Sequence, residues 1–116
     1  MSATSRIESL KKQIVDLGPV LPGSISQQWN VCGKAGCRCK DPKQPRKHGP
    51  YYQLSFTVGG KSSSMFLHKE DLRLARQAIT RYRTLRQLCT GLAAAYVTEA
   101  RRVGVVELCQ QEAPHG

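Results

Sequence analysis

Residues 51–67, YYQLSFTVGGKSSSMFL, decide the fold of this 116-residue chain. Apolar and polar residues alternate on both sides of Gly59-Gly60, a pair that can take the positive φ of a two-residue hairpin turn. Pairing outward from the turn gives these partners: Tyr52 with Leu67, Leu54 with Met65, Phe56 with Ser63 and Val58 with Lys61. The apolar residues of both strands then share one face, so the segment is predicted to be a β-hairpin. The letters GGKSSS lack the spacing of a phosphate-binding loop.

Residues 5–17 predict an amphipathic helix. Ser5 and Glu8 have the spacing of a capping box at its start. Its apolar residues recur at steps of three or four: Ile7, Leu10, Ile14 and Leu17. Gly18-Pro19 is typical of a helix end, and the following stretch, VLPGSISQQWN, is predicted to be a connector with a turn at Pro22-Gly23.

A long helix is predicted over residues 69–110, with Glu70 and Asp71 near its start, where acids are favourable. Its apolar residues form a narrow stripe, which we name the seam: Leu72, Ala75, Ile79, Tyr82, Leu85, Leu88 and Leu92. Such a stripe is typical of a coiled coil. We expect the seam to pack antiparallel to the first helix. Because the first helix is shorter than the seam, the remainder of the long helix is expected to fray, to bend near Gly91 or Gly104, or to find a partner subunit. Of these alternatives we adopt the partner subunit, a homo-oligomer.

Three cysteines and a histidine follow the connector with the spacing Cys32-x4-Cys37-x-Cys39-x8-His48. Three thiolates and one imidazole complete the tetrahedral ligand set of a structural Zn²⁺ ion, with no open position for water. Gly33 and Gly36 lie between the first two cysteines and permit a tight fold around a metal. The sequence leaves two alternatives open: a redox-active thiol group, or a zinc site whose fourth ligand is another residue, such as His68.

Cys89 and Cys109 lie in helical sequence and are predicted to be small buried apolar residues. An odd number of cysteines does not favour a secreted disulfide framework. A cysteine–histidine enzyme would need an activated nucleophile beside a base in a pocket, which so short a chain is not expected to build. We therefore expect no enzymatic activity.

Positive charge is the strongest compositional signal, with a formal net charge of +10. Residues 34–47, which we name the basic loop, hold six Lys or Arg residues and one acid, and this density favours a nucleic acid partner. Arginines of the long helix, among them Arg73 and Arg86, would extend the basic surface. The residues expected to bind nucleic acid are Lys34, Arg38, Lys40, Lys43, Arg46, Lys47, Tyr51, Lys61, Arg76, Arg81 and Arg83.

These patterns predict the α+β class: an N-terminal helix, a zinc-bound cysteine loop over residues 30–49, a hairpin over 51–67 and a long helix that pairs with the first. We expect a single zinc-stabilised domain over residues 1–110 and a disordered tail over 111–116. No apolar run approaches the length of a membrane helix, about 20 residues. The charged N-terminus differs from a signal peptide, so a cytoplasmic protein without membrane contact is expected.

The motifs CGKAGCRC, HGPYYQLSF and GGKSSS, with the helical KEDLRLARQAITRYRTLRQL, resemble a family of small bacterial proteins of unknown function. The resemblance covers roughly residues 5–92. It implies a special role for these residues: Cys32, Cys37, Cys39, His48, Gly49, Pro50 and Tyr51. It also implies a setting beside transposases and recombinases of mobile elements.

Together, the residues and the resemblance predict a small zinc-binding, DNA-binding accessory protein. The alternative is a protein-interaction adaptor that pairs through its seam, with zinc purely structural. Salt separates the two, because binding through phosphate contacts weakens steeply as salt rises.

Overall fold

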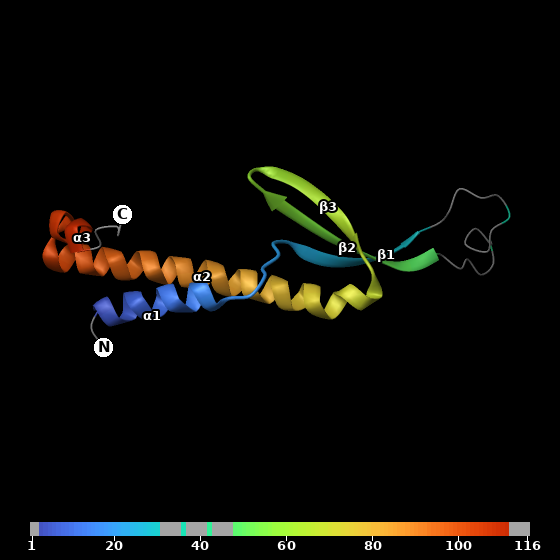
Figure 1. Ribbon diagram of the computed structural model, residues 1–116. Helices are drawn as coiled ribbons and strands as arrows, with labels where there is room; N and C mark the ends of the chain where they lie inside the picture. Colours follow the sequence, from blue (N-terminus) through green and yellow to red (C-terminus); the bar gives the residue numbers. More distant parts are fainter. Residues whose placement is uncertain (1–2, 31–35, 37–41, 43–47, 112–116) are drawn as a thin grey trace. The chain divides into compact units, whose positions relative to one another are not determined.

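A short helix, three antiparallel strands and a long helix follow one another in the computed structural model of the chain (Figure 1). The elements are α1 (Ala3–Asp16), β1 (Ser24–Asn30), β2 (His48–Val58), β3 (Lys61–Leu67), the 3₁₀ turn η2 (Lys69–Asp71), α2 (Leu72–Val103) and α3 (Val105–Gln111). The structure describes residues 3–30, 36, 42 and 48–111. The predicted α+β class is confirmed.

The chain divides into two compact units. The sheet unit is Val20–Ile79, which includes the first turns of α2. The helical unit is Met1–Pro19 together with Thr80–Gly116.

The sheet has the strand order β1-β2-β3, and both pairs are antiparallel. The predicted hairpin register is confirmed, since Tyr52 pairs with Leu67 and Leu54 pairs with Met65. Gly59 and Gly60 form the turn with φ values of 59° and 79°. The register fixes which residues of β2 and β3 share a face.

Strand β1 corrects the prediction of a connector over residues 20–30. Its residues, SISQQWN, are mostly polar and give little apolar alternation. Ile25 lies opposite Leu54 and Gln27 lies opposite Tyr52 in the adjacent strand. The strand therefore forms because β2 supplies its hydrogen-bonding partners, and its own sequence pattern is too weak to predict it.

Among the described residues of the sheet unit, the buried apolar residues are Leu54, Leu72, Ala75, Ala78 and Ile79. Leu54 is completely buried in the central strand. The backbone N–H of Leu21 donates to the carbonyl of Ala78 at 3.1 Å, which joins the segment before β1 to the start of α2.

In the helical unit, α1 runs antiparallel to α2, as the two apolar stripes predicted (Figure 1). A Cβ placed on Gly91 would lie 3.8 Å from a methyl carbon of Leu10, so the helices approach closely there. The Lys11 ammonium lies 5.7 Å from the centre of the Tyr96 ring. Arg81 donates to the carbonyl oxygen of Pro19 at 3.2 Å, beyond the other end of α1.

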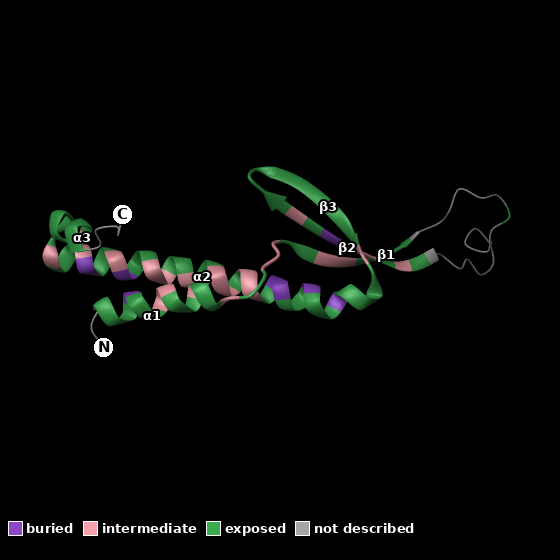
Figure 2. Cartoon of the chain, viewed as in Figure 1, coloured by how far each residue is buried: buried purple, intermediate pink, exposed green. Residues whose placement is uncertain are grey.

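All seven seam residues are buried or half-buried within the single chain, although the seam is longer than the first helix. Leu72, Ala75 and Ile79 are buried in the sheet unit. The remaining seam residues are half-buried: Tyr82, Leu85, Leu88 and Leu92 (Figure 2). The homo-oligomer remains a prediction, and only the half-buried residues of the seam still favour it.

The predicted helix over residues 69–110 is three elements in the structure. A 3₁₀ turn precedes α2. The helix is interrupted at Gly104, one of the two glycines where a bend was expected. Gly104 has a φ of 91° and its N–H donates to the carbonyl of Ala100 at 2.7 Å. This geometry ends α2 and allows α3 to begin in a new direction.

Cys89 and Cys109 are exposed, so the prediction that both are buried is wrong. Cys89 is adjacent in sequence to the seam residue Leu88, and one helical step rotates it about 100° away from the seam. Cys109 lies on α3, a helix without buried residues. Helical sequence alone did not distinguish the two sides of these helices.

Glu99 is a buried acid that the sequence pattern did not predict, with a side chain only 2% exposed. Arg102 forms two hydrogen bonds with its carboxylate, one of them from Nε at 3.1 Å. These hydrogen bonds lower the pKa of Glu99, and burial opposes them by favouring the neutral acid. The pair satisfies a buried polar group near the end of α2.

We predict that Gly23→Ala destabilises the sheet unit strongly. Gly23 has a φ of 98°, and an added Cβ would lie 2.1 Å from the carbonyl oxygen of Ser55 in β2. Gly60→Ala is the control, because its φ is 79° but no atom lies within 4 Å of the added Cβ. Gly60→Ala should lower the free energy of unfolding by about 1–2 kcal/mol through backbone strain, and Gly23→Ala should lower it by more. Urea unfolding followed through Trp29 fluorescence measures both losses. Equal losses would contradict the prediction.

A second prediction concerns Arg102→Met, which would leave the Glu99 carboxylate buried without its partner. A folded-state pKa below the ordinary carboxyl value means that the pair stabilises at neutral pH, and that this stabilisation is lost as pH falls through the lowered pKa. Arg102→Met should therefore lower the midpoint of thermal unfolding more at neutral pH than in acid. Arg101→Met, at the exposed neighbouring position, is the control and should show little pH dependence. If Arg102→Met lowers the midpoint of thermal unfolding equally at neutral and acid pH, the stabilising role of the Glu99–Arg102 pair is refuted.

Candidate nucleic-acid interface

The predicted zinc ligands and the basic loop lie mainly outside the described residues. Outside them are the cysteines of the cluster, the side chain of His48, and six cations, Lys34, Arg38, Lys40, Lys43, Arg46 and Lys47. Within the described ranges, no group of three or more His, Cys, Asp or Glu side chains could hold a metal ion. The assignment of Cys32, Cys37, Cys39 and His48 to Zn²⁺ stays a prediction.

The structure does describe the two ends of this loop. β1 ends at Asn30 and β2 begins at His48, and these two residues are partners in the antiparallel ladder. In sequence, Cys32 comes two residues after Asn30. The cluster therefore begins and ends, in sequence, next to two paired strand positions, which fits a donor set that must converge on one ion.

A β-bulge lies beside this paired end. The register shifts between Gln28 and Asn30: Trp29 alone lies between these two residues on β1, whereas Gly49 and Pro50 lie between their partners on β2, so the extra residue is on β2. Gly49 has a φ of 139°, and an added Cβ would lie 2.8 Å from the carbonyl oxygen of Gln28 and 3.3 Å from the Trp29 ring. The peptide bond from Gly49 to Pro50 is cis. The motif HGPYY thus has a structural role in the sheet, because only glycine fits at this position.

One face of the sheet carries exposed aromatic rings beside amide and hydroxyl groups, and we name it the aromatic–amide face. Its members are Gln28, Tyr51, Gln53, Ser64 and Phe66. The register places Gln28 opposite Tyr51 and Gln53 opposite Phe66. Phe66 is 73% exposed and Tyr51 is 41% exposed. Two aromatic rings therefore face solvent on neighbouring strands, on the side of β2 opposite to buried Leu54.

Hydrogen bonds fix the amides of this face. Nε2 of Gln28 donates to Oε1 of Gln53 at 3.1 Å, and Nε2 of Gln53 donates to Oγ of Ser64 at 2.8 Å. These two hydrogen bonds link side chains of all three strands. It holds the Gln53 carboxamide in one orientation between the two aromatic residues, Tyr51 and Phe66.

A pocket of about 580 Å³ opens where β2 begins and β3 ends, and this end of the sheet also carries Asn30 and His48. It is lined by Pro50, Tyr51, Tyr52, Phe66, Leu67, His68 and Lys69. The turn at its edge is fixed, because the His68 N–H donates to the Asp71 carboxylate and the Asp71 N–H donates to the His68 carbonyl, each at 2.9 Å. The pocket combines aromatic walls with one lysine.

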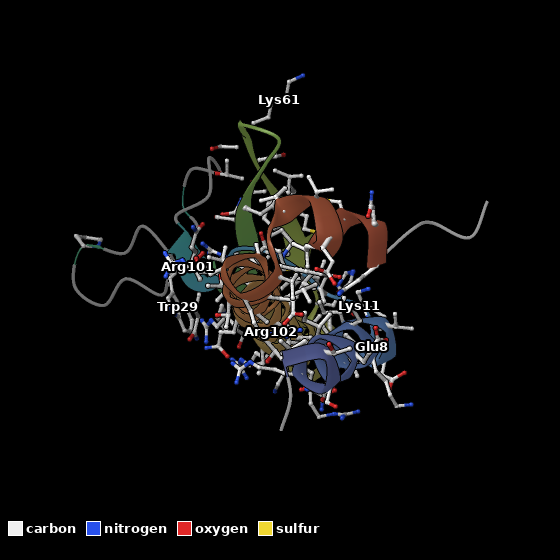
Figure 3. All side chains as sticks on the ribbon, turned by 90° about the vertical axis from the view of Figure 1, so that its left-hand side faces the viewer. Glu8, Lys11, Trp29, Lys61, Arg101 and Arg102 are labelled. Carbon is white, nitrogen blue, oxygen red and sulfur yellow. The ribbon has the colours of Figure 1, made fainter. Side chains whose placement is uncertain are left out.

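Five residues predicted to bind nucleic acid lie in the described ranges: Tyr51, Lys61, Arg76, Arg81 and Arg83. Tyr51 lines the pocket, whereas Lys61 projects from the hairpin tip at the other end of the strands (Figure 3). Arg83 and Arg76 are exposed on α2. Arg81 is half-buried and bonds the Pro19 carbonyl, which gives it a structural role. The structure therefore brings one of the five, Tyr51, to the pocket.

Sequence reasoning missed the other members of the pocket and of the aromatic–amide face, notably Phe66, Lys69 and Gln53. A signal was present in the predicted register. The alternation that buries Leu54 also places Tyr51, Gln53 and Phe66 together on the opposite face. The apolar alternation predicts the buried face of the hairpin, and the remaining positions of the same strands form the exposed face.

Residues 4–77 match a protein family described as "Domain of unknown function (DUF6788)", and the chain belongs to this family. This agrees with the resemblance to a small family of unknown function. Neither the curated proteins nor the solved structures contain a match to the chain. Among the helices in the described part of the chain, none is sufficiently long and apolar to cross a membrane.

We predict that the purified protein carries about one zinc ion per chain, and that Cys37→Ser or Cys39→Ser loses it. Elemental analysis after dialysis measures the metal, and thermal unfolding measures the accompanying loss of stability. Cys89→Ser is the control, because Cys89 is an exposed cysteine on α2 and should retain both zinc and stability. Protein without zinc, or cluster variants that match the parent, would contradict the prediction.

Proposed function

We propose that this member of the DUF6788 family is a small zinc-binding protein that binds nucleic acid, with duplex DNA as the ligand of its basic loop. The observation that carries the proposal is the uneven distribution of charge along the chain. The sheet unit, Val20–Ile79, contains ten Lys or Arg residues and three Asp or Glu residues. The helical unit contains eight and five.

The sheet unit is also short of acids near its strands. Between Asp16 and Glu70 the sequence has a single acid, Asp41. The three strands contain none, and their one Lys or Arg residue is Lys61. A polyanion can therefore approach the strands of this unit without repulsion from carboxylates on them, and the basic loop would supply the attraction.

In this proposal the zinc ion is structural. Bound by Cys32, Cys37, Cys39 and His48, it would fold the loop and reduce the entropy its cations lose on binding DNA. The cations would contact phosphates, which position a protein on DNA without reading its sequence. The resemblance to companions of transposases and recombinases suggests an accessory role on a mobile element.

A second candidate function is a helix-mediated adaptor for a recombinase or for a second copy of the chain. It is favoured by Tyr82, Leu85, Leu88 and Leu92, which remain half-buried although α1 lies against α2. A partner helix could bury them further. In this case zinc serves only the fold, and assembly should tolerate salt.

The test compares two triple variants. Arg38, Lys40 and Lys47 replaced together by Ala should weaken duplex binding broadly across sequences and flatten the plot of log affinity against log salt by up to about 2.7, or about 0.9 per lost phosphate contact. Arg73, Arg83 and Arg86 are exposed on α2, and their replacement by Ala should have a smaller effect. Arg81 is omitted because it bonds Pro19.

Fluorescence anisotropy with labelled duplexes measures both affinities. A larger loss from the α2 variant would show that the basic loop is not the main surface. If the parent protein binds neither DNA nor RNA but light scattering shows salt-resistant assembly, the adaptor function replaces the proposal.

A further inference from the structure

We propose that the pocket and the aromatic–amide face bind an unpaired nucleic acid strand, with one base stacked in the pocket. This inference rests on the proposed nucleic-acid binding and assigns it a ligand class and residues that the basic loop does not provide. The pocket residues that would carry it are Tyr51, Phe66 and Lys69, and the neighbouring amide is Gln53.

Exposure of the aromatic side chains supports stacking with a base. Phe66 has no polar atom, yet it is 73% exposed beside the half-exposed ring of Tyr51. Both side chains line the pocket, together with Tyr52. Stacking of a base on such rings is a main source of affinity for single strands, because every base offers an aromatic face.

The size and position of the pocket also suit a base. Its volume of about 580 Å³ is in the range of small-ligand sites. Lys69 lies on the wall, where its ammonium group can pair with the phosphate next to a stacked base. Two acids, Glu70 and Asp71, follow Lys69 in the sequence, and the Asp71 carboxylate already accepts a hydrogen bond from the His68 N–H. The local chemistry thus offers an aromatic surface and a cation.

Hydrogen bonds fix the carboxamide of Gln53 on the same face. A carboxamide has two donor hydrogens and two acceptor lone pairs. In the structure its Nε2 donates once, to Ser64, and its Oε1 accepts once, from Gln28. One donor and one acceptor remain next to Phe66, a pair that suits the hydrogen-bonding edge of an unpaired base.

The same arrangement disfavours duplex DNA as the ligand of this face. In a duplex the faces of the bases are covered by their stacked neighbours, and proteins reach only the base edges in the grooves. The major groove admits a helix or a two-stranded ribbon, whereas the face here spans three strands. Aromatic rings on such a face can stack only on bases that have left the duplex.

The experiment measures affinity for labelled oligothymidine and for a duplex of the same length by fluorescence anisotropy, with zinc-loaded full-length protein. The test variants are Phe66→Ala and Tyr51→Ala. Met65→Ala is the matched control, because Met65 is an apolar residue 48% exposed on the same strand as Phe66 but on the opposite face. Thermal unfolding of each variant verifies that the sheet unit remains folded.

We expect each test variant to weaken oligothymidine binding by about tenfold, as stacked aromatic side chains commonly do. Duplex affinity and the Met65→Ala variant should remain near the parent. Oligothymidine containing 5-iododeoxyuridine should cross-link on illumination to Tyr51 or Phe66, as identified by mass spectrometry. This second measurement keeps the test decisive if a substitution unfolds the sheet.

Two outcomes would overturn the inference in distinguishable ways. If the duplex binds through the basic loop but the aromatic variants bind oligothymidine like the parent and no cross-link forms at the pocket, the inference fails and the proposed function stands. If no nucleic acid binds the parent protein, both fail, and the exposed aromatic residues belong to a protein-binding surface.

Discussion

The pairing of β2 on both of its edges is the constraint on which the sheet unit depends. β2 is the only strand of the described sheet with two neighbours, and it carries Leu54, the one apolar side chain in the described residues that is completely buried. The strand alternation that buries Leu54 turns Tyr51 and Gln53 to the other side. A shift of one residue would exchange these faces, so burial of one leucine determines what the opposite face exposes.

The same pairing determines what gathers at one end of the sheet. Antiparallel neighbours place the end of β1 and the end of β3 beside the beginning of β2. The cysteine and basic sequence leaves from Asn30 and returns at His48, and the pocket opens beside Tyr51. Loop and pocket are therefore consequences of one register, although they lie in different stretches of sequence.

The sequence predicted the parts of the fold that depend on clear periodicity. The hairpin register followed from alternation around Gly59-Gly60, and the antiparallel helix pair followed from two matching stripes. β1 was missed because two apolar residues, Ile25 and Trp29, four positions apart, do not mark a strand that is stabilised by its neighbour. The exposed Cys89 and the buried Glu99 were missed because each depends on how tightly one side of α2 is covered. Such coverage is a tertiary property that helical periodicity does not contain.

For the candidate site, sequence composition and spacing predict the zinc ligands and the basic loop, and the pairing of the strands adds the aromatic–amide face. The two surfaces would make different physical contributions to binding. Phosphate contacts made by lysine and arginine act at long range and weaken with salt, whereas stacking on Phe66 and Tyr51 acts at contact and depends on an unpaired base. A protein that combines them would be drawn to any nucleic acid by charge and retained where a strand is open. Such selectivity requires no reading of base sequence, which agrees with a sheet whose strands carry a single Lys or Arg residue and no acid.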